Sequence, residues 1–102
     1  GQEVALCAAA AGVQLLSAMM LAAAKSLLVV ADVNAVPPPG VEGLDPMADG
    51  VELAGGSLGI GPLAIGNVKY RTESGLFRRM AASSNAISLD FRDAFALARQ
   101  IA

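Results

Sequence analysis

Polar side chains that could bind a ligand directly follow a short apolar run. Residues 27–31 are unbroken apolar residues, and Asp32 and Asn34 appear where the run ends. Such a run is typical of a strand covered on both faces of a parallel sheet. Ligands of open α/β sheets bind outside the carboxyl ends of the strands, where residues 32–43 would lie. This loop is either a rigid platform for a planar ligand or a polyproline connector, and the spacing leaves both open.

The same loop contains three consecutive prolines, Pro37, Pro38 and Pro39, followed by Gly40. Each proline fixes φ and lacks an amide donor, so the segment cannot continue a helix or a central strand. We therefore expect a stiff loop at the sheet edge.

A second pattern, Gly59, Gly61 and Ala64, fits the G-x-G-x-x-[GA] sequence of dinucleotide-binding turns. Asp90 could then bind a ribose. However, Pro62 removes an amide donor that a pyrophosphate would use. Asp90 also lies 31 residues beyond Gly59, whereas the usual spacing is about 20. The alternative, tight packing of a strand against a helix, is therefore favoured.

Few other side chains suit catalysis. Lys69 is expected near the same sheet edge and could meet a phosphate, a carboxylate or a carboxamide, although a solvated helix lysine is the more frequent case. The chain has no histidine, the commonest acid–base group and metal ligand. Cys7 is its one cysteine, which excludes an internal disulfide and favours a small core residue. We expect no metal site.

The overall composition narrows the class of protein. The chain has 102 residues, of which 55% are hydrophobic and 16% charged, with a net charge of −2. It therefore forms one domain or part of one. No basic cluster occurs beyond Arg78 and Arg79, so nucleic-acid binding is disfavoured. The chain begins with Gly1 rather than methionine, from which we expect a fragment or a processed product.

The uncharged run of residues 5–24 raises the question of a membrane span. About half of the run is alanine, and Gln14 and Ser17 interrupt it, so we expect no membrane segment. Glu3 stands where a secretory signal would carry positive charge. We therefore expect a cytoplasmic protein.

Strand-like and helix-like segments alternate along the chain. We expect strands at 3–8, 27–31, 57–60 and 87–89, a short strand at 51–53 within a surface excursion at 44–56, one helical turn at 13–16, and helices at 18–25, 63–82 and 91–101. Ser17 and Asp90 are the expected N-caps, with Lys25 in the last turn of the first helix. This order predicts an α/β fold with a mostly parallel sheet and flanking helices.

The segments ADVNAVPPPGVEGL, LGIGPLAIGNVKY and LDFRDAFALAR resemble the carboxyl-terminal part of NAD(P)-dependent methylene-tetrahydromethanopterin dehydrogenases of methylotrophic bacteria. The resemblance implies that residues 1–102 form the later part of a Rossmann-like domain. It also implies NADP or NAD as cofactor and a reduced pterin as substrate, in the cleft between two domains. The family's glycine-rich fingerprint and most of its pterin domain would lie upstream. The complete enzyme is expected to be a homo-oligomer.

The implied reaction oxidises the methylene bridge between two pterin nitrogens and passes hydride to the nicotinamide. No proton need move, so the protein mainly orients the two rings, which fits the absence of histidine. By resemblance, the cofactor-binding residues are Ala9, Ala10, Gly12, Asp32, Asn34 and Lys69, and Pro37 and Pro38 bind the substrate. The resemblance singles out no catalytic residue.

Two alternatives remain beside this interpretation. One is a related methylene-tetrahydrofolate dehydrogenase, because the residues that choose the pterin would lie upstream. The other is a non-catalytic α/β fragment that associates with a partner. We expect the isolated chain to be inactive, and to be poorly soluble, oligomeric or marginally folded, because a cut parallel sheet exposes an apolar edge and bare apolar faces.

Overall fold

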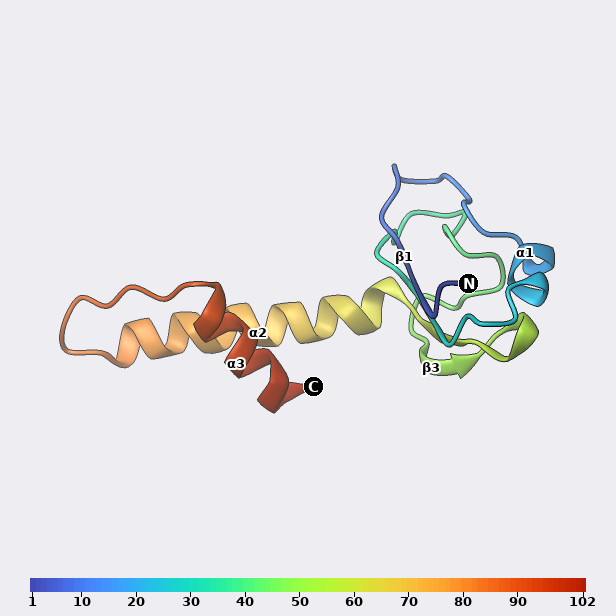
Figure 1. Ribbon diagram of the computed structural model, residues 1–102. Coiled ribbons are helices and arrows are strands. Elements are labelled where there is room, and N and C mark those ends of the chain that lie inside the picture. The colour runs from blue at the N-terminus through green and yellow to red at the C-terminus, as the bar shows by residue number, and fades with distance from the viewer. The chain divides into compact units, whose positions relative to one another are not determined.

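The computed structural model describes all 102 residues and divides them into two compact units, Gly1–Ile65 and Gly66–Ala102. The first unit contains a four-stranded sheet with a short helix, and the second is helical (Figure 1). The predicted α/β class with a mostly parallel sheet is confirmed.

The sheet contains three parallel strands and one antiparallel edge strand. Its order is β1-β2-β4-β3, with β1 at Val4–Cys7, β2 at Val29–Asp32, β4 at Leu58–Ile60 and β3 at Asp49–Glu52. β1 and β4 both pair parallel to β2, whereas β3 pairs antiparallel to β4. The central strand is β2, and its carboxyl end is Asp32.

One face of this sheet carries the core. Side chains alternate between the faces along a strand, and the register places Ala5, Val30 and Gly59 side by side. Val30 is fully buried there. A Cβ on Gly59 would lie 2.7 Å from Leu44 and 2.8 Å from Leu53, so the glycine lets these leucines approach the sheet. The core consists of Cys7, Leu21, Leu27, Val30, Val41, Leu44 and Ala48.

Helix α1, Ala18–Ala23, packs on the same unit through Leu21, which is buried. Ser17 is its N-cap and accepts a hydrogen bond from the Met20 amide, as predicted. A short 3₁₀ turn, Ala54–Gly56, lies against this helix. Gly55 has φ +85°, and a Cβ there would lie 2.5 Å from the Leu21 carbonyl oxygen. Close approach and backbone conformation therefore both require glycine.

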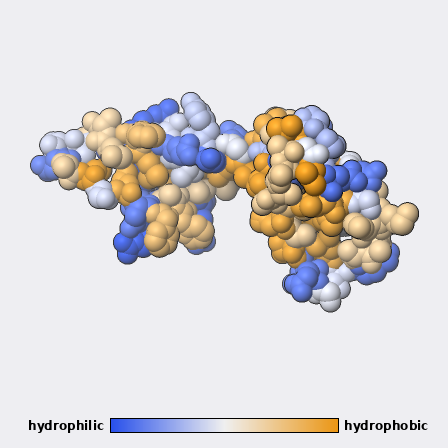
Figure 2. Space-filling model, turned by 90° about the horizontal axis from the view of Figure 1, so that it is seen from above, coloured by the Kyte–Doolittle hydropathy of each residue, from blue (hydrophilic) through white to orange (hydrophobic).

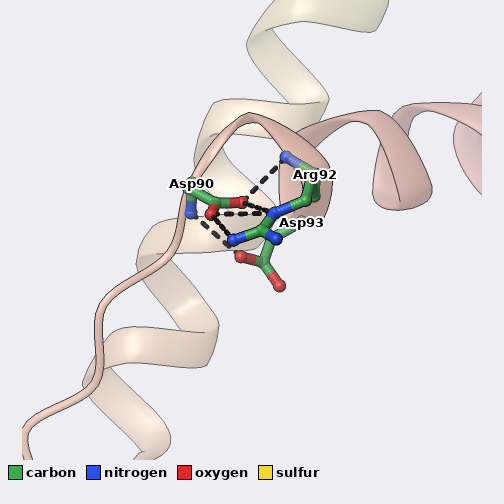
Figure 3. Close-up of polar contacts among 3 residues, drawn as sticks. All are labelled: Asp90, Arg92 and Asp93. Atoms are coloured by element: carbon green, nitrogen blue, oxygen red, sulfur yellow. Dashed lines mark hydrogen bonds and ion pairs between the residues drawn. The ribbon is translucent and has the colours of Figure 1, made fainter.

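The second unit consists of most of α2, Pro62–Ala82, and all of α3, Phe91–Ile101. The two helices touch where Gly75 meets Leu97, since a Cβ on this glycine would lie 2.7 Å from the leucine Cδ2. Figure 3 shows the start of α3. Asp90 accepts the Arg92 amide, and Asp93 accepts the Asp90 amide. The predicted cap and helix are confirmed.

Four local predictions are wrong. Residues 13–16 form no helical turn, because Leu16 instead bridges to Val41. Residues 87–89 form no strand and lead directly to the cap of α3. α1 ends at Ala23, so Lys25 lies outside its last turn. Residues 44–56 are not wholly a surface excursion, because Leu44 and Ala48 are buried.

None of the helices combines the length and the apolarity that crossing a bilayer requires.

Candidate functional site

The carboxylate of Asp32 anchors the proline loop at the carboxyl end of β2. Asp32 is completely buried. Its Oδ1 accepts the Asn34 amide at 2.9 Å, and its Oδ2 accepts the Gly40 amide at 2.7 Å. Charge-assisted bonds of this kind are about twice as strong as neutral ones. Both ends of the loop are thus tied to one side chain.

Gly40 closes the loop at a position that leaves little room for a side chain. A Cβ at this position would lie 3.0 Å from both carboxylate oxygens of Asp32. The Gly40 carbonyl oxygen accepts the amides of Leu15 and Leu16 at 2.8 and 2.9 Å. The loop therefore joins the segment that follows β1.

Asn34 presents a buried donor without a partner. The residue is 8% exposed, and its Oδ1 accepts the Val36 amide at 3.0 Å. This bond fixes which amide atom is oxygen. Nδ2 is buried and donates no hydrogen bond. An unpaired buried donor costs about 1–3 kcal/mol, so an acceptor that displaces the atoms covering Nδ2 would stabilise it.

The turn at residues 9–12 lies beside the proline loop. Gly12 has φ +76°, and a Cβ there would meet the Pro37 carbonyl oxygen at 3.5 Å and Pro38 Cδ at 3.9 Å. Ala9 is half-buried, Ala10 is exposed, and Pro37 and Pro38 are exposed around a cis peptide bond. The structure thus brings together the predicted site residues of the first unit.

Cys7 is a buried core residue at the carboxyl end of β1. It pairs with Asp32 in the β1–β2 register and is buried. Burial raises the pKa of the Cys7 thiol, and the negative charge of Asp32 raises it further. The thiol therefore stays protonated near neutral pH and is a poor nucleophile. The predicted role as a core residue is confirmed, since Cys7 belongs to the core cluster.

Comparisons with known proteins show what the chain as a whole is similar to. No protein-family model matches the chain. The chain is 50% identical, over 101 residues, to an NAD(P)-dependent methylenetetrahydromethanopterin dehydrogenase of Methylorubrum extorquens. The resemblance predicted from the sequence is confirmed. The match covers 98% of this chain and 34% of the dehydrogenase.

A second relative is more distant. The bifunctional protein MdtA of the same organism is 31% identical over 102 residues, which are all of this chain and 35% of that protein. The chain therefore spans about a third of the length of the curated relatives it matches.

Within the segment similar to the dehydrogenase, Lys69 is the one predicted cofactor-binding residue outside the first unit. It lies on α2 in the second unit and is exposed. Its Nζ is 3.9 Å from Glu73 Oε1, one helical turn away. Such exposed pairs contribute little to stability. A role of Lys69 at the cofactor stays a prediction.

The glycine motif of this segment serves packing. A Cβ on Gly61 would collide with the carbonyl oxygens of Asp45 and Pro46, and the Leu63 amide donates to the Pro46 oxygen at 2.9 Å. Carbonyl oxygens at the start of α2 would repel a phosphate. Both glycines, Gly59 and Gly61, are therefore closely packed, but against Leu44, Leu53 and the backbone of residues 45–46 rather than against a helix as expected.

Sequence reasoning missed Glu42 and the anchoring use of Asp32 and Gly40. Glu42 Oε2 accepts the Ala18 amide at the start of α1, at 2.7 Å. An acid at a helix N-terminus is a known stabilising signal, but 24 residues separate the two. Only the fold brings them together.

Proposed function

We propose that this chain forms the nicotinamide-binding wall of an NAD(P)-dependent dehydrogenase that oxidises methylene-tetrahydromethanopterin to its methenyl form. The similarity to the Methylorubrum extorquens dehydrogenase supports the activity and the NAD(P) cofactor. The structural observation that carries the proposal is the buried, unpaired Nδ2 of Asn34. It lies in the loop at the carboxyl end of β2, where ligands of Rossmann-like sheets bind.

In this proposal Asn34 orients the nicotinamide. Nδ2 is buried, so the atoms that cover it move aside when the cofactor binds, and Nδ2 then donates to the carboxamide oxygen or to the neighbouring ribose. Ala9, Ala10 and Gly12 offer little side-chain volume, so a flat ring can approach the backbone of the turn. The free donor and the small turn together favour a planar ligand that carries an acceptor.

Pro37 and Pro38 would contact the pterin. Both rings are exposed, and their loop is held at Asp32, so they offer a rigid apolar surface. A preorganised surface loses little entropy on binding. By the resemblance, the positively charged Lys69 would also contact the cofactor.

In the site, NAD(P) would supply the hydride acceptor for the methylene carbon, and the lone pairs of the adjacent nitrogens would stabilise the methenyl cation that remains. The residues of this chain need to transfer no proton. Asn34 and the proline loop hold the two rings at reacting distance and exclude water, which are the contributions that such a reaction demands of the protein.

The complete enzyme is proposed to be a cytoplasmic homo-oligomer. Broad exposure of apolar side chains in the first unit, including Val4 and Leu6, which are 63% and 64% exposed, supports association.

The test replaces Asn34 by alanine. Titration calorimetry with NAD and with NADP should show about tenfold weaker binding, because one hydrogen bond of about 1.4 kcal/mol is lost. Asn67→Ala, at an exposed position of α2, is the matched control and should leave affinity unchanged. The measurement is made on this chain and on a longer polypeptide that contains it. In the longer polypeptide, the KM for the cofactor should rise or kcat should fall.

Equal affinities of the Asn34→Ala and Asn67→Ala variants, with KM and kcat unchanged, would remove Asn34 from the site. Absence of NAD(P) binding by both unsubstituted polypeptides would contradict the proposed function itself.

A further inference from the structure

Asp32 is buried, and both of its carboxylate oxygens accept hydrogen bonds from the backbone. Its exposure is 0%, and the ion pairs of the chain join only Lys69 to Glu73 and Arg92 to Asp90. Burying a carboxylate without a cation is costly unless hydrogen bonds compensate it. The two amide bonds at 2.9 and 2.7 Å are that compensation.

We propose that Asp32 is a positioning residue, which sets the separation between the turn at residues 9–12 and the proline loop and makes no contact with NAD(P). That these two segments bind a dinucleotide rests on the proposed function. The role of Asp32 within the fold rests on the hydrogen bonds alone.

A continuous chain of hydrogen bonds links Asp32 to both segments. Asp32 Oδ2 accepts the Gly40 amide, and the Gly40 carbonyl accepts the amides of Leu15 and Leu16. The Leu16 carbonyl in turn accepts the Glu42 amide at 2.8 Å. Leu15 follows Gly12 by three residues, so the position of the turn depends on Gly40 and, through it, on Asp32.

The other carboxylate oxygen sets the direction of Asn34. Oδ1 accepts the Asn34 amide, while Asn34 Oδ1 accepts the Val36 amide. These two bonds fix the backbone and the side chain of Asn34, so its free Nδ2 points in a defined direction. Asp32 thus sets, through Asn34, the position of the Nδ2 atom that is proposed to donate to the ligand.

A carboxylate is required because both of its ends must accept a hydrogen bond. Asparagine has nearly the same shape, but its NH₂ group would face either the Gly40 or the Asn34 amide, donor against donor. Asp32→Asn therefore removes one anchor without creating a cavity.

Amide hydrogen exchange, measured by NMR, tests this directly. In Asp32→Asn, the amides of Gly40, Leu15 and Leu16 should exchange at least tenfold faster than in the unsubstituted chain. The Leu58 amide, which donates to the Leu28 carbonyl at 2.8 Å, reports on the sheet and should keep its rate. Asn34→Ala should leave the Gly40 rate unchanged while it weakens NAD(P) binding.

Asp32→Asn should also weaken NAD(P) binding about tenfold, together with the faster exchange. Weaker binding with unchanged exchange at Gly40, Leu15 and Leu16 would overturn the inference, because it would make Asp32 a direct ligand. Unchanged exchange with unchanged binding would overturn it as well. If the unsubstituted chain binds no dinucleotide, the exchange rates alone still decide the role of Asp32.

A second variant covers the case in which Asp32→Asn does not fold. Gly40→Ala places a Cβ 3.0 Å from both carboxylate oxygens and preserves the charge, so the Leu15 and Leu16 amides should again exchange faster. In the unsubstituted chain, a through-hydrogen-bond coupling between the Gly40 nitrogen and the Asp32 carboxyl carbon should be detectable. Its absence would contradict the inference whether or not the variants fold.

Discussion

The two units of this chain are stabilised in different ways. In Gly1–Ile65, apolar residues from strands, a helix and loops form one buried core. In Gly66–Ala102, Thr72 is the only buried residue, while Phe77, Phe91 and Phe95 are 70%, 80% and 64% exposed. Tertiary packing therefore holds the first unit together, whereas caps and contacts within and between two helices hold the second.

This difference explains where the candidate site lies. A buried, unpaired donor such as Asn34 Nδ2 persists only where surrounding structure enforces it. The core beneath β2 provides that support, and the second unit has nothing equivalent.

The first unit also leaves apolar surface uncovered. Val4 and Leu6 on β1 and Leu58 on β4 point away from the core and are 63%, 64% and 44% exposed. Hydrophobic residues cover a wide area of this unit in Figure 2. The prediction that the isolated chain is poorly soluble, oligomeric or marginally folded stays a prediction, and this surface supplies a physical basis for it.

Truncation of an apolar side chain should produce the largest contrast between the units. Leu21→Ala in α1, at a residue 2% exposed, should lower the free energy of unfolding by about 2–5 kcal/mol. Phe95→Ala in α3 should change it by less than about 0.5 kcal/mol, because the ring is already largely in water. Urea titrations followed by NMR signals of each unit measure both values.

Leu21→Met, which nearly conserves the side-chain volume, is the control and should lower the free energy of unfolding by less than about 1.5 kcal/mol. Equal losses for Leu21→Ala and Phe95→Ala would show that the two units are stabilised alike.

Replacing Gly61 or Gly66 by alanine should change the stability of the protein in opposite directions. Gly61→Ala forces a Cβ onto the backbone oxygens of Asp45 and Pro46 and should destabilise the first unit by about 1–3 kcal/mol. Gly66→Ala meets nothing within 4 Å and should stabilise α2 by about 1 kcal/mol. Thermal unfolding monitored by circular dichroism distinguishes the two variants, and a neutral or stabilising effect of Gly61→Ala would contradict the packing role of Gly61.

The smallest effect concerns pH and the start of α3. The hydrogen bond with the Arg92 side chain, at 2.6 Å to Asp90 Oδ2, is the main reason that the pKa of Asp90 lies below its ordinary 3.8. A depressed pKa contributes stability above the unfolded value, and this contribution is lost as pH falls through the folded one. Helical signal from α3 should therefore decrease slightly below about pH 4.

Arg92→Ala should move the Asp90 titration midpoint upward, as followed by carboxyl ¹³C NMR. Arg99→Ala, in the last turn of the same helix, is the control and should leave the midpoint where it is. An unchanged midpoint in Arg92→Ala would show that the guanidinium does not set the pKa of Asp90.

Much of the fold follows from local patterns in the sequence. Ser17 and Asp90 begin their helices as predicted, because an N-cap is satisfied by residues two or three positions away. The apolar run before Asp32 forms the central strand. The failures at 13–16 and 87–89 occur in short segments, where a distant partner such as Val41 decides the conformation.

The features of the candidate site likewise fall into those that local sequence predicts and those that depend on the tertiary structure. The sequence by itself determined the α/β order and the loop of Asp32, Asn34 and the prolines, because residue type and spacing specify strand ends and stiff turns. Only the tertiary structure decided that the Asp32 carboxylate anchors the proline loop, since its partner Gly40 lies eight residues away. It likewise decided that Asn34 keeps one free donor and that Gly61 serves packing, because burial and long-range contacts depend on how the chain folds back on itself.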